Sequence, residues 1–429
     1  MEQFRQLGII EPILKVIQEE KFEKPTSIQV KGIPLVLSGQ DVIAESATGS
    51  GKTLTFGAGI IQKTNRREGV QALVVAPTRE LAEQVGRALM NFSRYKPLQM
   101  TIVYGGVPIG PQIRNLQSAD IVIGTPGRIL DHIERGTLNL GRVNTLVLDE
   151  ADHMLDMGFI DDVEKIIRQC PAKRQTLLFS ATIPQDIAQL ARKYMKNPVK
   201  VAGEGFVDPR KLKQVYYDVP DNLKFSLLTH LLKNEKSGLV MVFCNSRRNT
   251  DFVANNLRFA GLDSVAIHGG LTQSRRNSIM RKFHAKSTHV LVCTDVAARG
   301  LDIPGVSHVY NYDIPKDTKQ YVHRIGRTAR AGKEGKAVNI VASRDYENFT
   351  KVLEYHDIDV EQEEVPYVEK AKLGWIEKPR NDRGWHKHQG SDRSGGGRGY
   401  AQERRNDRGY GNTSRNDYSP PERRPKWGK

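Results

Sequence analysis

Short apolar runs rich in β-branched residues recur along the first half of the chain, and stretches of helical character separate them. We expect five of these runs to be strands: Asp41–Ile43, Ala72–Val75, Ile121–Ile123, Leu146–Leu148 and Thr176–Phe179. Strands that are apolar along almost their whole length and alternate with helices are typical of a parallel sheet covered on both faces. The pattern therefore predicts an α/β domain over residues 30–203, preceded by an N-terminal region of residues 1–29.

The same alternation begins again in the second half of the chain. A linker is predicted over residues 204–212, because Gly203–Pro209 has the Gly and Pro content of a connecting segment. The strands expected after it are Leu239–Phe243, Val265–Ile267, Val290–Cys293, Val306–Asn311 and Ala337–Val341. We therefore predict a second parallel-sheet α/β domain over residues 213–366.

Apolar periodicity stops after about residue 366, where Gly, Arg, Asn, Asp and Ser take over. Such a segment cannot bury enough apolar surface to offset chain entropy, so residues 367–429 are predicted to form a disordered basic tail. A loose repeat occurs within it: Arg380–Trp385, Arg405–Tyr410 and Arg415–Tyr418. Arg, Gly and aromatic side chains together suit RNA, through phosphate pairing and base stacking. A tail that only keeps the protein in solution is the alternative.

The overall composition agrees with two globular domains and a polyanionic partner. The chain has 429 residues, 38% of them hydrophobic, and a formal net charge of +16. Residues 370–429 carry 16 Lys and Arg against 7 Asp and Glu, so the positive charge is concentrated at the C-terminus. Cys170, Cys244 and Cys293 lack the spacing of a zinc site or a disulfide framework, and we expect buried thiols in a reducing compartment.

The chain shows neither a secretory signal nor a membrane span. Charged residues occupy the N-terminus, and no apolar run approaches the length that a bilayer requires. We therefore expect a cytoplasmic protein without a membrane partner.

Adjacent carboxylates stand directly after the apolar run Leu146–Leu148, in the sequence Asp149-Glu150-Ala151-Asp152. A buried strand that ends in two carboxylates can hold Mg²⁺ with one of them and orient or deprotonate a water molecule with the other. This is the chemistry of nucleoside-triphosphate hydrolysis. It also requires a cradle for the phosphates.

A phosphate cradle is predicted at the segment Ala47–Thr53. Its glycines permit a tight backbone whose N–H groups point at phosphate oxygens, Lys52 reaches the β- and γ-phosphates, and Thr53 ligates Mg²⁺. Ser46 stands where the general pattern has Gly, so alone this segment could be a Gly-rich turn; the carboxylate strand favours the nucleotide site. The expected ATP-binding residues here are Thr48, Gly49, Ser50, Gly51, Lys52 and Thr53.

Two further segments bring polar and aromatic groups to this site. Ser180-Ala181-Thr182 follows an apolar strand, which would place small hydroxyls beside the carboxylates, although such a pair is more often a helix cap. Upstream, the amide of Gln29 can donate and accept hydrogen bonds on the edge of adenine, and Phe4 and Phe22 supply aromatic rings. On physical grounds alone, Phe22 could equally belong to the core.

Taken together and in this order, these segments resemble the motifs of the DEAD-box RNA helicases, a branch of the superfamily-two helicases. The resemblance covers residues 4 to about 342 and rests on Phe22–Gln29 with the upstream Phe4, Thr48–Thr53, Asp149–Asp152, Ser180–Thr182, Thr294–Asp302 and His323–Arg330. It implies two tandem RecA-like domains. It also implies an RNA-dependent ATPase and RNA helicase that uses ATP and Mg²⁺.

The resemblance assigns roles in ATP hydrolysis residue by residue. It implies that Asp149 holds Mg²⁺ through water and that Glu150 positions the attacking water. Arg327 and Arg330 would act as arginine fingers on the γ-phosphate, and Asp302 would contact the ribose. Because the fingers lie on the second domain, hydrolysis would require closure of the two domains. Coupling between the domains is assigned to Asp152, Ser180, Thr182 and His323.

Three positions depart from the family pattern without loss of a catalytic group. Ser46 stands where the family usually has Ala, Lys21 where Gly often precedes the aromatic residue, and Ala329 where Gly is common. Ala329 is unstrained only if its φ is below zero.

The resemblance also assigns an RNA surface shared between the domains. Glycine pairs and helix N-termini expose backbone N–H groups without reading a base, so single-stranded RNA and short duplexes should bind with little sequence preference. Ribonucleoprotein and decay complexes are further candidate partners. The assigned residues are Pro77, Thr78, Arg79, Gly105, Gly106, Thr125, Pro126, Gly127 and Arg128 on the first domain, and Asn245, Arg247, Gly269, Gly270, Gln273, Arg276 and Thr294 on the second.

Three functions are compatible with these motifs. The first is a helicase that opens short RNA duplexes locally and is reset by ATP hydrolysis. The second is an ATP-gated RNA clamp or annealing chaperone with the basic tail as its main RNA-binding arm. The third, a DNA translocase, fits less well because related processive helicases usually have different motif sequences.

Overall fold

The computed structural model describes residues 1–46, 49–203, 212–235, 237–298, 301, 303, 305–329, 334–354 and 359–374, and the structural findings concern these residues. They belong to one compact unit that extends from Met1 to Glu377 and carries two parallel sheets. The prediction of two α/β domains is therefore confirmed.

The first sheet contains seven strands within the described residues: β1 (Val42–Glu45), β2 (Ala72–Val75), β3 (Met100–Val103), β4 (Ile121–Gly124), β5 (Thr145–Leu148), β6 (Gln175–Ser180) and β7 (Val199–Ala202). They are parallel and follow the order β3-β4-β2-β5-β6-β1-β7. All five predicted strands are present. The sequence pattern missed β3 and β7, which form the two edges and bury fewer of their positions, so neither is apolar throughout.

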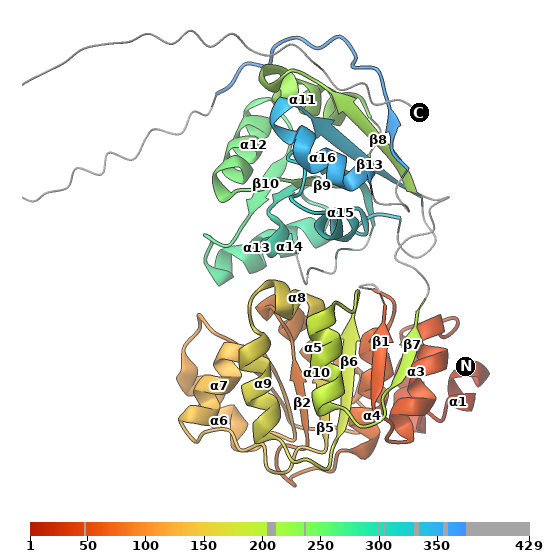
Figure 1. Cartoon of the computed structure of the whole chain (residues 1–429). Coiled ribbons are helices and arrows are strands. Elements are labelled where there is room, and N and C mark those ends of the chain that lie inside the picture. The colour runs from red at the N-terminus through yellow and green to blue at the C-terminus, as the bar shows by residue number, and fades with distance from the viewer. Residues whose placement is uncertain are drawn as a thin grey trace, which may run out of the picture. The chain divides into compact units, whose positions relative to one another are not determined.

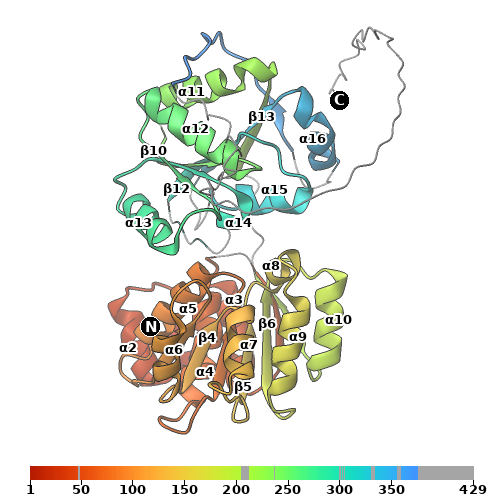
Figure 2. The same cartoon turned by 90° about the vertical axis from the view of Figure 1, so that its left-hand side faces the viewer.

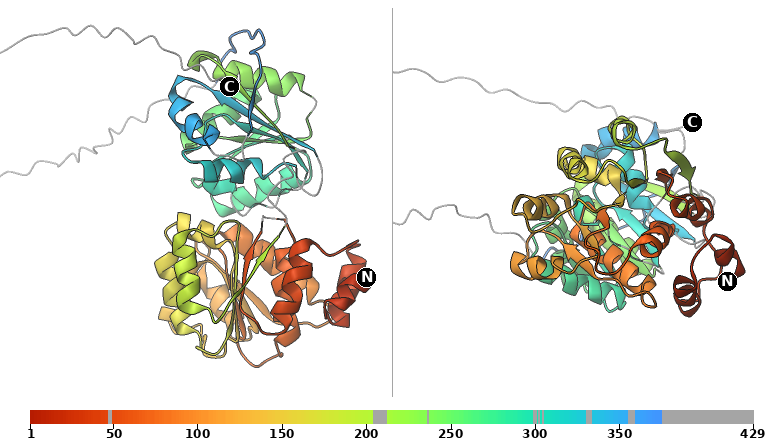
Figure 3. Two further views of the ribbon diagram at one scale, coloured as in Figure 1. Left: turned by 45° about the vertical axis from the view of Figure 1, so that its right-hand side comes forward. Right: turned by 90° about the horizontal axis from the view of Figure 1, so that it is seen from below.

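Helices cover both faces of this sheet (Figures 1 and 3). Alternate residues of β1 explain why, since Val42 and Ala44 pack into one core cluster and Ile43 packs into the other. The first cluster is covered by α1 (Glu2–Gln6), α2 (Glu11–Glu19), α3 (Ser27–Leu37), α4 (Lys52–Lys63) and α5 (Arg79–Phe92). The second is covered by α6 (Ile109–Leu116), α7 (Pro126–Glu134), α8 (Ala151–Asp156), α9 (Ile160–Gln169) and α10 (Gln185–Tyr194).

The second sheet repeats this arrangement with seven described strands: β8 (Leu212–Asp218), β9 (Leu239–Phe243), β10 (Ser264–Ile267), β11 (Val290–Cys293), β12 (Val306–Asn311), β13 (Gly335–Val341) and β14 (Glu361–Gln362). Their order is β10-β11-β9-β12-β13-β8-β14, again parallel throughout. The five predicted strands are present, and β8 and β14 were missed. Leu212, assigned to the linker, is the first residue of β8, and the other linker residues lie outside the described part of the chain.

Helices also cover both faces of the second sheet (Figure 2). One face carries η2 (Asp221–Leu223), α11 (Lys224–Asn234) and α12 (Arg247–Phe259). The other carries α13 (Gln273–His284), α14 (Asp295–Ala298), α15 (Thr318–Ile325) and α16 (Tyr346–Leu353). The short η4 (Ser343–Asp345) leads from β13 into α16.

The boundary predicted at residue 366 is wrong, because the chain stays packed on the second domain as far as Gly374. Val368 and Ala371 contact the core cluster beneath α11 and α12. The backbone N–H of Ala371 donates to Ser226 Oγ at 2.9 Å, and that of Gly374 donates to Asn256 Oδ1 at 3.0 Å. These contacts were not predicted because they involve only two apolar side chains and two backbone groups. The rest of the tail lies outside the described residues.

The three cysteines are buried and free, as predicted. Burial raises the pKa of Cys170 to about 11, so its thiol stays protonated and unreactive near neutral pH. Across the part of the chain that the structure describes, no helix has the length and apolar character needed to span a membrane.

Candidate active site

The predicted nucleotide groups lie at the carboxyl edge of the first sheet. Because β5, β6 and β1 are neighbours in the order β5-β6-β1, the segments that follow them meet at this edge (Figure 1). Asp149–Asp152 follows β5, Ser180 ends β6, and the phosphate loop follows β1. Asp149, Glu150 and Asp152 are all at most 2% exposed, so these are carboxylates held in a low-dielectric interior.

Glu150 adopts a strained backbone conformation at the start of α8, with φ of 52° and ψ of 53°. A residue other than Gly in this left-handed region costs on the order of 1–3 kcal/mol and persists only where the surroundings fix it. Here the Glu150 N–H donates to Asp149 Oδ1 at 3.0 Å, and Glu150 Oε2 lies 2.9 Å from His153 Nδ1. Burial alone raises the pKa of Glu150, but the charge and hydrogen bond of His153, together with Lys52, outweigh it and hold this pKa well below its usual range. Glu150 is therefore ionised.

The pKa of Asp149 is shifted in the direction opposite to that of Glu150. Burial, strengthened by the neighbouring Glu150 carboxylate, raises the pKa of Asp149 to about 6, although Lys52 opposes the shift. Lys52 Nζ lies 3.7 Å from Asp149 Oδ1, beyond hydrogen-bonding distance. A buried ammonium and a buried carboxylate thus face the same space without neutralising each other fully.

The described part of the phosphate loop, Gly49–Lys52, has the backbone that the sequence predicts. Gly49 and Gly51 have φ of 83° and 94°, a region open to Gly at little cost. A Cβ on Gly51 would lie 2.4 Å from Gln29 Nε2, so no larger residue fits there. Helix α4 begins at Lys52, which directs its free N–H groups to this loop. Thr48 lies outside the described residues.

Gln29 fastens α3 to the phosphate loop. Its Oε1 accepts from Thr26 N at 2.9 Å as part of a capping box, and its Nε2 donates to Gly51 O at 3.3 Å. Thr26 Oγ1 donates to Ser50 O at 2.7 Å. Gln29 keeps one amide N–H for a ligand, but its position also makes it a support for the loop.

The two aromatic residues predicted near adenine occupy different environments. Phe4 is fully buried, with its ring centroid 6.5 Å from that of Phe22. Phe22 is half-buried and packs edge-on against Phe92. The assignment of Phe4 as a nucleotide contact is therefore corrected to a core residue beneath Phe22, because no face of its ring is accessible.

Asp152 binds the segment that follows β6. Asp152 Oδ2 accepts from Thr182 N at 3.0 Å and from Thr182 Oγ1 at 3.2 Å, and Asp152 N donates to Ser180 Oγ at 3.1 Å. Ser180 Oγ in turn donates to Thr182 O at 2.7 Å. Asp152 Oδ1 accepts from His153 N at 3.0 Å, so both carboxylate oxygens of Asp152 are hydrogen-bonded and Asp152 is not positioned as a catalyst.

His153 was missed by sequence reasoning. Its Nδ1 contacts Glu150, and its Nε2 lies 3.3 Å from His323 Nδ1 of the second domain. The sequence does place His153 three residues after Glu150 at the start of a helix. Side chains at this spacing lie on the same face of a helix, so the contact could have been predicted. His323 also lies 3.9 Å from Asp152 Oδ2, and Asp152 bonds to Ser180 and Thr182, so the four predicted coupling residues lie close together.

Of the two predicted arginine fingers, the structure describes Arg327, which is 4% exposed. It donates from Nη1 to Leu301 O at 2.9 Å and from Nε to His323 O at 3.3 Å, and its charge helps to lower the pKa of Glu150. Arg330 and Asp302 lie outside the described residues.

The RNA residues predicted on the first domain follow three neighbouring strands, β2, β3 and β4. Thr78 caps α5 by accepting from Leu81 N at 3.2 Å, and Thr125 is the N-cap residue of α7. Arg128 donates to Val107 O at 3.3 Å, which ties the start of α7 to the loop around Gly105-Gly106. Pro77, Arg79, Pro126 and Gly127 belong to the same segments, so the structure brings this set together.

The RNA residues predicted on the second domain follow β9, β10 and β11 in the same way. Arg247 lies against Gly269, where an added Cβ would be 3.3 Å from Arg247 Nη2, and Asn245 Oδ1 accepts from Arg324 at 2.7 Å. Gly270 and Thr294 lie at the ends of β10 and β11.

Glu80 makes contacts with α13 that sequence reasoning missed. Its Oε1 lies 2.8 Å from Arg276 Nε and accepts from Gln273 Nε2 at 2.9 Å. It belongs to the segment Pro77–Leu81 that carries the predicted RNA contacts, but nothing in the sequence pairs it with α13.

The protein has two parallel sheets of the same strand order, and the first carries a phosphate loop and buried carboxylates. This architecture is that of a two-domain nucleotide-hydrolysing protein of the helicase class. Comparison with protein families agrees. The DEAD/DEAH box helicase model matches residues 26–190, and the helicase conserved C-terminal domain model matches residues 223–332.

Similar proteins narrow the class further. The DEAD-box ATP-dependent RNA helicase CshA of Geobacillus kaustophilus is 49% identical over 349 residues, which are 80% of this chain and 74% of that protein. The ATP-dependent RNA helicase CshA of Listeria monocytogenes is 48% identical over 349 residues, 80% of this chain and 67% of that protein. Among solved structures, S. cerevisiae Dbp5 bound to RNA and ADP BeF3 is 31% identical, with a TM-score of 0.78 over 85% of this chain and 96% of that chain.

The chain therefore belongs to the DEAD-box family of ATP-dependent RNA helicases. It is an ATP-hydrolysing enzyme whose partner is RNA.

Proposed function

We propose that the protein opens short RNA duplexes locally: ATP and a single RNA strand draw the two domains together, and hydrolysis releases the strand. The observation that carries this proposal is the shared edge of the first sheet. Lys52, Asp149 and Glu150 stand there after β1 and β5, and the RNA segments stand there after β2, β3 and β4. One rigid sheet thus connects the two ligands.

Mg²⁺ fits this site. Asp149 and Thr53 offer the hard oxygen donors that Mg²⁺ prefers, usually with several retained waters. Ser46 Oγ and Ser50 Oγ are buried without a hydrogen-bond partner among the described residues, so these two hydroxyls could bind a ligand. When bound, the ion would supply positive charge that neutralises the phosphates. Thr53 and, through water, Asp149 would hold it.

Glu150 is proposed to position the attacking water. Its low pKa keeps it ionised, and its hydrogen bond to His153 fixes the direction of the carboxylate. Lys52 would bind the β- and γ-phosphates, Gly49, Ser50, Gly51 and Thr48 would cradle them, and Gln29 with Phe22 would face the base.

The second domain is proposed to complete the reaction. Arg327 and Arg330 would stabilise the charge that develops on the γ-phosphate, and Asp302 would hold the ribose. His323, close to both His153 and Asp152, would report the presence of nucleotide to the second domain.

The RNA strand is proposed to lie along the predicted residues of both domains, held by its backbone. Arg79 and Arg128 carry the positive charge, and the glycine pairs Gly105-Gly106 and Gly269-Gly270 expose backbone N–H groups. Binding of this kind carries little sequence preference. The basic residues after Gly374 would add affinity that depends strongly on salt.

Glu150→Gln tests the proposal. The variant should bind ATP and RNA normally and lose turnover by about 10²- to 10⁴-fold, because the carboxylate that orients water is gone. The measurements are ATP hydrolysis with RNA, nucleotide binding, and opening of a short labelled duplex. Glu347→Gln, an exposed carboxylate on α16, is the matched control. Normal turnover in Glu150→Gln would remove the role assigned to Glu150.

The second candidate, an RNA clamp or annealing chaperone, is favoured by the surplus of Lys and Arg over residues 370–429. A protein that ends at Gly374 separates the two candidates. If it keeps RNA-stimulated hydrolysis and duplex opening while it loses annealing, both activities exist in different parts of the chain. If its RNA affinity and salt dependence match those of the full chain, the tail is not an RNA-binding arm.

A further inference from the structure

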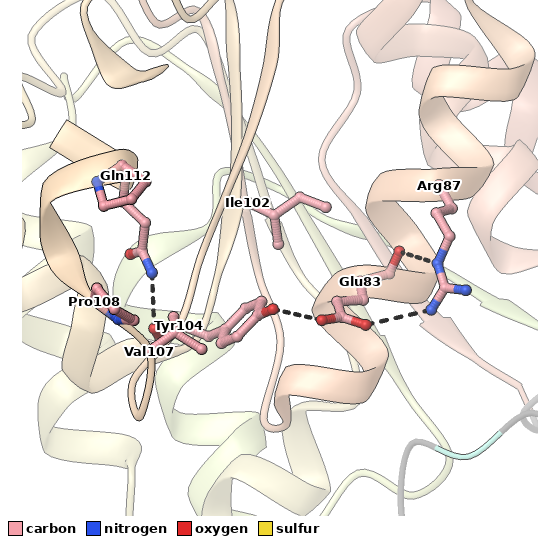
Figure 4. Close-up of a pocket in the computed structure, with 8 residues that line it drawn as sticks. Glu83, Arg87, Ile102, Tyr104, Val107, Pro108 and Gln112 are labelled. Carbon is pink, nitrogen blue, oxygen red and sulfur yellow. Dashed lines mark hydrogen bonds and ion pairs between the residues drawn. The ribbon is translucent and has the colours of Figure 1, made fainter. Parts of the chain in front are cut away.

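A pocket of the first domain is lined by Tyr104 and Val107, the two residues that flank Gly105-Gly106 in the sequence (Figure 4). Its volume is about 430 Å³, within the range of roughly 300–1,000 Å³ that small-molecule sites occupy. One wall is α5, which contributes Glu83 and Arg87. The other wall is the segment from β3 to α6, which contributes mostly apolar side chains: Ile102, Tyr104, Val107, Pro108 and Pro111.

Tyr104 is the central group of this pocket. Figure 4 shows its ring reaching from the loop toward α5, where the hydroxyl donates to Glu83 Oε1 at 2.5 Å. Arg87 holds the other oxygen of Glu83 from 3.4 Å. The backbone of Tyr104 is also anchored, because Gln112 Nε2 donates to its carbonyl at 3.1 Å. An aromatic ring is therefore held at both ends, between a neutralised carboxylate and an apolar wall.

The pocket is continuous with the groups proposed to bind the RNA backbone. Tyr104 immediately precedes Gly105-Gly106. Arg79 lies against Gly106, where an added Cβ would be 2.3 Å from Arg79 Nη1, and Arg128 holds the carbonyl of Val107. A phosphate placed on this loop would leave its base close to the mouth of the pocket.

We propose that this pocket receives one unpaired base of the bound RNA strand, stacked on the ring of Tyr104. This inference rests on the proposed function, since it requires RNA on this loop. Tyr104 is an aromatic residue directly next in sequence to the predicted RNA residue Gly105, and every base has a face that can stack on its ring. Arg87 lines the pocket, and Arg79 and Arg128 contact the adjoining loop. The one acid among the lining residues, Glu83, is paired with Arg87, which favours a polyanionic strand over a neutral peptide.

The consequence is a preference for single strands at one nucleotide. A base in a duplex is paired and stacked, and entry into the pocket would require it to leave the helix. The pocket would therefore help to hold a strand that has already been opened.

The test is a scan with abasic RNA on the full chain. The probe is a short single strand attached to a stable hairpin that fixes its register, with one base removed at a time, and binding is measured with a non-hydrolysable ATP analogue. We expect one position at which loss of the base weakens binding by about 5- to 150-fold. In Tyr104→Ala the intact strand should bind more weakly by a similar factor, and removal of that base should then have no effect.

Further variants distinguish the ring from the fold. Tyr104→Phe removes the hydroxyl and should keep the position-specific effect. Val107→Trp fills the pocket while its backbone carbonyl remains for Arg128, and should abolish the effect. Tyr95→Ala, an exposed aromatic residue whose ring contacts Lys15, is the matched control and should match the wild type.

If removal of each base weakens binding equally in a protein that binds RNA and shows RNA-stimulated hydrolysis, the base pocket alone is overturned. The same conclusion follows if removal of the one sensitive base still weakens binding to Tyr104→Ala. A wild-type protein that neither binds RNA nor responds to it would overturn the proposed function, and this inference with it.

Discussion

The two domains have the same strand order, but the lysines at equivalent places, each at the start of the α-helix that follows the first strand of its sheet, have different roles. One is available to a ligand, and the other stabilises the fold. Lys52 begins α4 after β1, and Lys224 begins α11 after β8, which holds the equivalent place in the second sheet. Lys224 is fully buried, and its Nζ lies 2.6 Å from Asp345 Oδ2. Lys52 Nζ stays 3.7 Å from Asp149.

This difference shows that the same position in the fold can bind a ligand in one domain and stabilise the folded chain in the other. In the second domain, the ion pair of Lys224 is complete, and the Tyr312 ring lies 5.3 Å from its Nζ, so the group contributes to the fold. In the first domain, glycines replace packed side chains at the same place and leave the ammonium available to a phosphate. Among the described residues, the Ser46 and Ser50 hydroxyls beside the phosphate loop have no hydrogen-bond partner, whereas the Lys224 ammonium is paired with Asp345.

Loss of an arginine finger should have the largest effect. Arg327→Ala is expected to lower RNA-stimulated ATP hydrolysis by about 10³- to 10⁵-fold, because the finger acts only in the transition state. Nucleotide and RNA affinities should change little. Steady-state kinetics with saturating RNA measure the rate, and Arg258→Ala, on the exposed end of α12, is the control.

An Arg327→Ala protein with near-normal kcat would show that the second domain does not supply the charge. Thermal unfolding of the same protein separates loss of rate from loss of fold, since Arg327 also bonds to Leu301 O.

The two lysines should separate activity from stability. Lys224→Met breaks a buried ion pair and is expected to lower the free energy of unfolding by about 3–5 kcal/mol, because Asp345 is left buried and unpaired. Lys52→Met should abolish ATP hydrolysis with a much smaller loss of stability, since its contact with Asp149 is long.

Denaturant unfolding and ATP hydrolysis, measured on both variants, check this pair. The comparison fails if Lys224→Met unfolds no more readily than Lys52→Met, or if the folded fraction of Lys224→Met has lost hydrolysis.

The smallest effect concerns two strained residues, one in each domain. Lys21 and Ala329 have φ of 56° and 54°, at positions where the family often has Gly. Lys21→Gly and Ala329→Gly should each raise the free energy of unfolding by about 1 kcal/mol, since relief of the left-handed backbone exceeds the entropy that Gly adds to the unfolded chain.

Lys233→Gly within α11 provides the opposite expectation, a loss of about 1 kcal/mol, because Gly is unfavourable in a helix. Equal destabilisation by all three substitutions would contradict the claim of strain.

Most central strands were predictable from the sequence, whereas of the four edge strands of the two described sheets only β10 was predicted. Strands β2, β9, β11 and β12 match the predicted bounds; β2, β9 and β11 are buried along their whole length and apolar throughout, and β12 is buried at four of its six positions. Strands β3, β7, β8 and β14 lie at or next to a sheet edge, where polar residues such as Lys200 and Gln214 occur. Their pairing depends on distant strands, which no local pattern encodes.

For the site, the residues that the structure describes from the nucleotide motifs lie at the predicted edge, apart from Phe4. What the sequence did not predict are contacts made in space: His153 with His323, Glu80 with α13, and Tyr104 with Glu83. Each involves a residue just outside a recognisable motif, and each depends on the packing of two elements. The positive φ of Ala329 likewise follows from its surroundings, and the condition for an unstrained residue there is not met.

The most direct test of the central claim, that ATP hydrolysis on the first domain serves an RNA strand, is the rate of hydrolysis by the full chain. It is measured without nucleic acid, with a single-stranded RNA and with a DNA strand of matched sequence. The account predicts strong stimulation by RNA and little by DNA. Equal stimulation by both strands, or hydrolysis that ignores nucleic acid altogether, would contradict it.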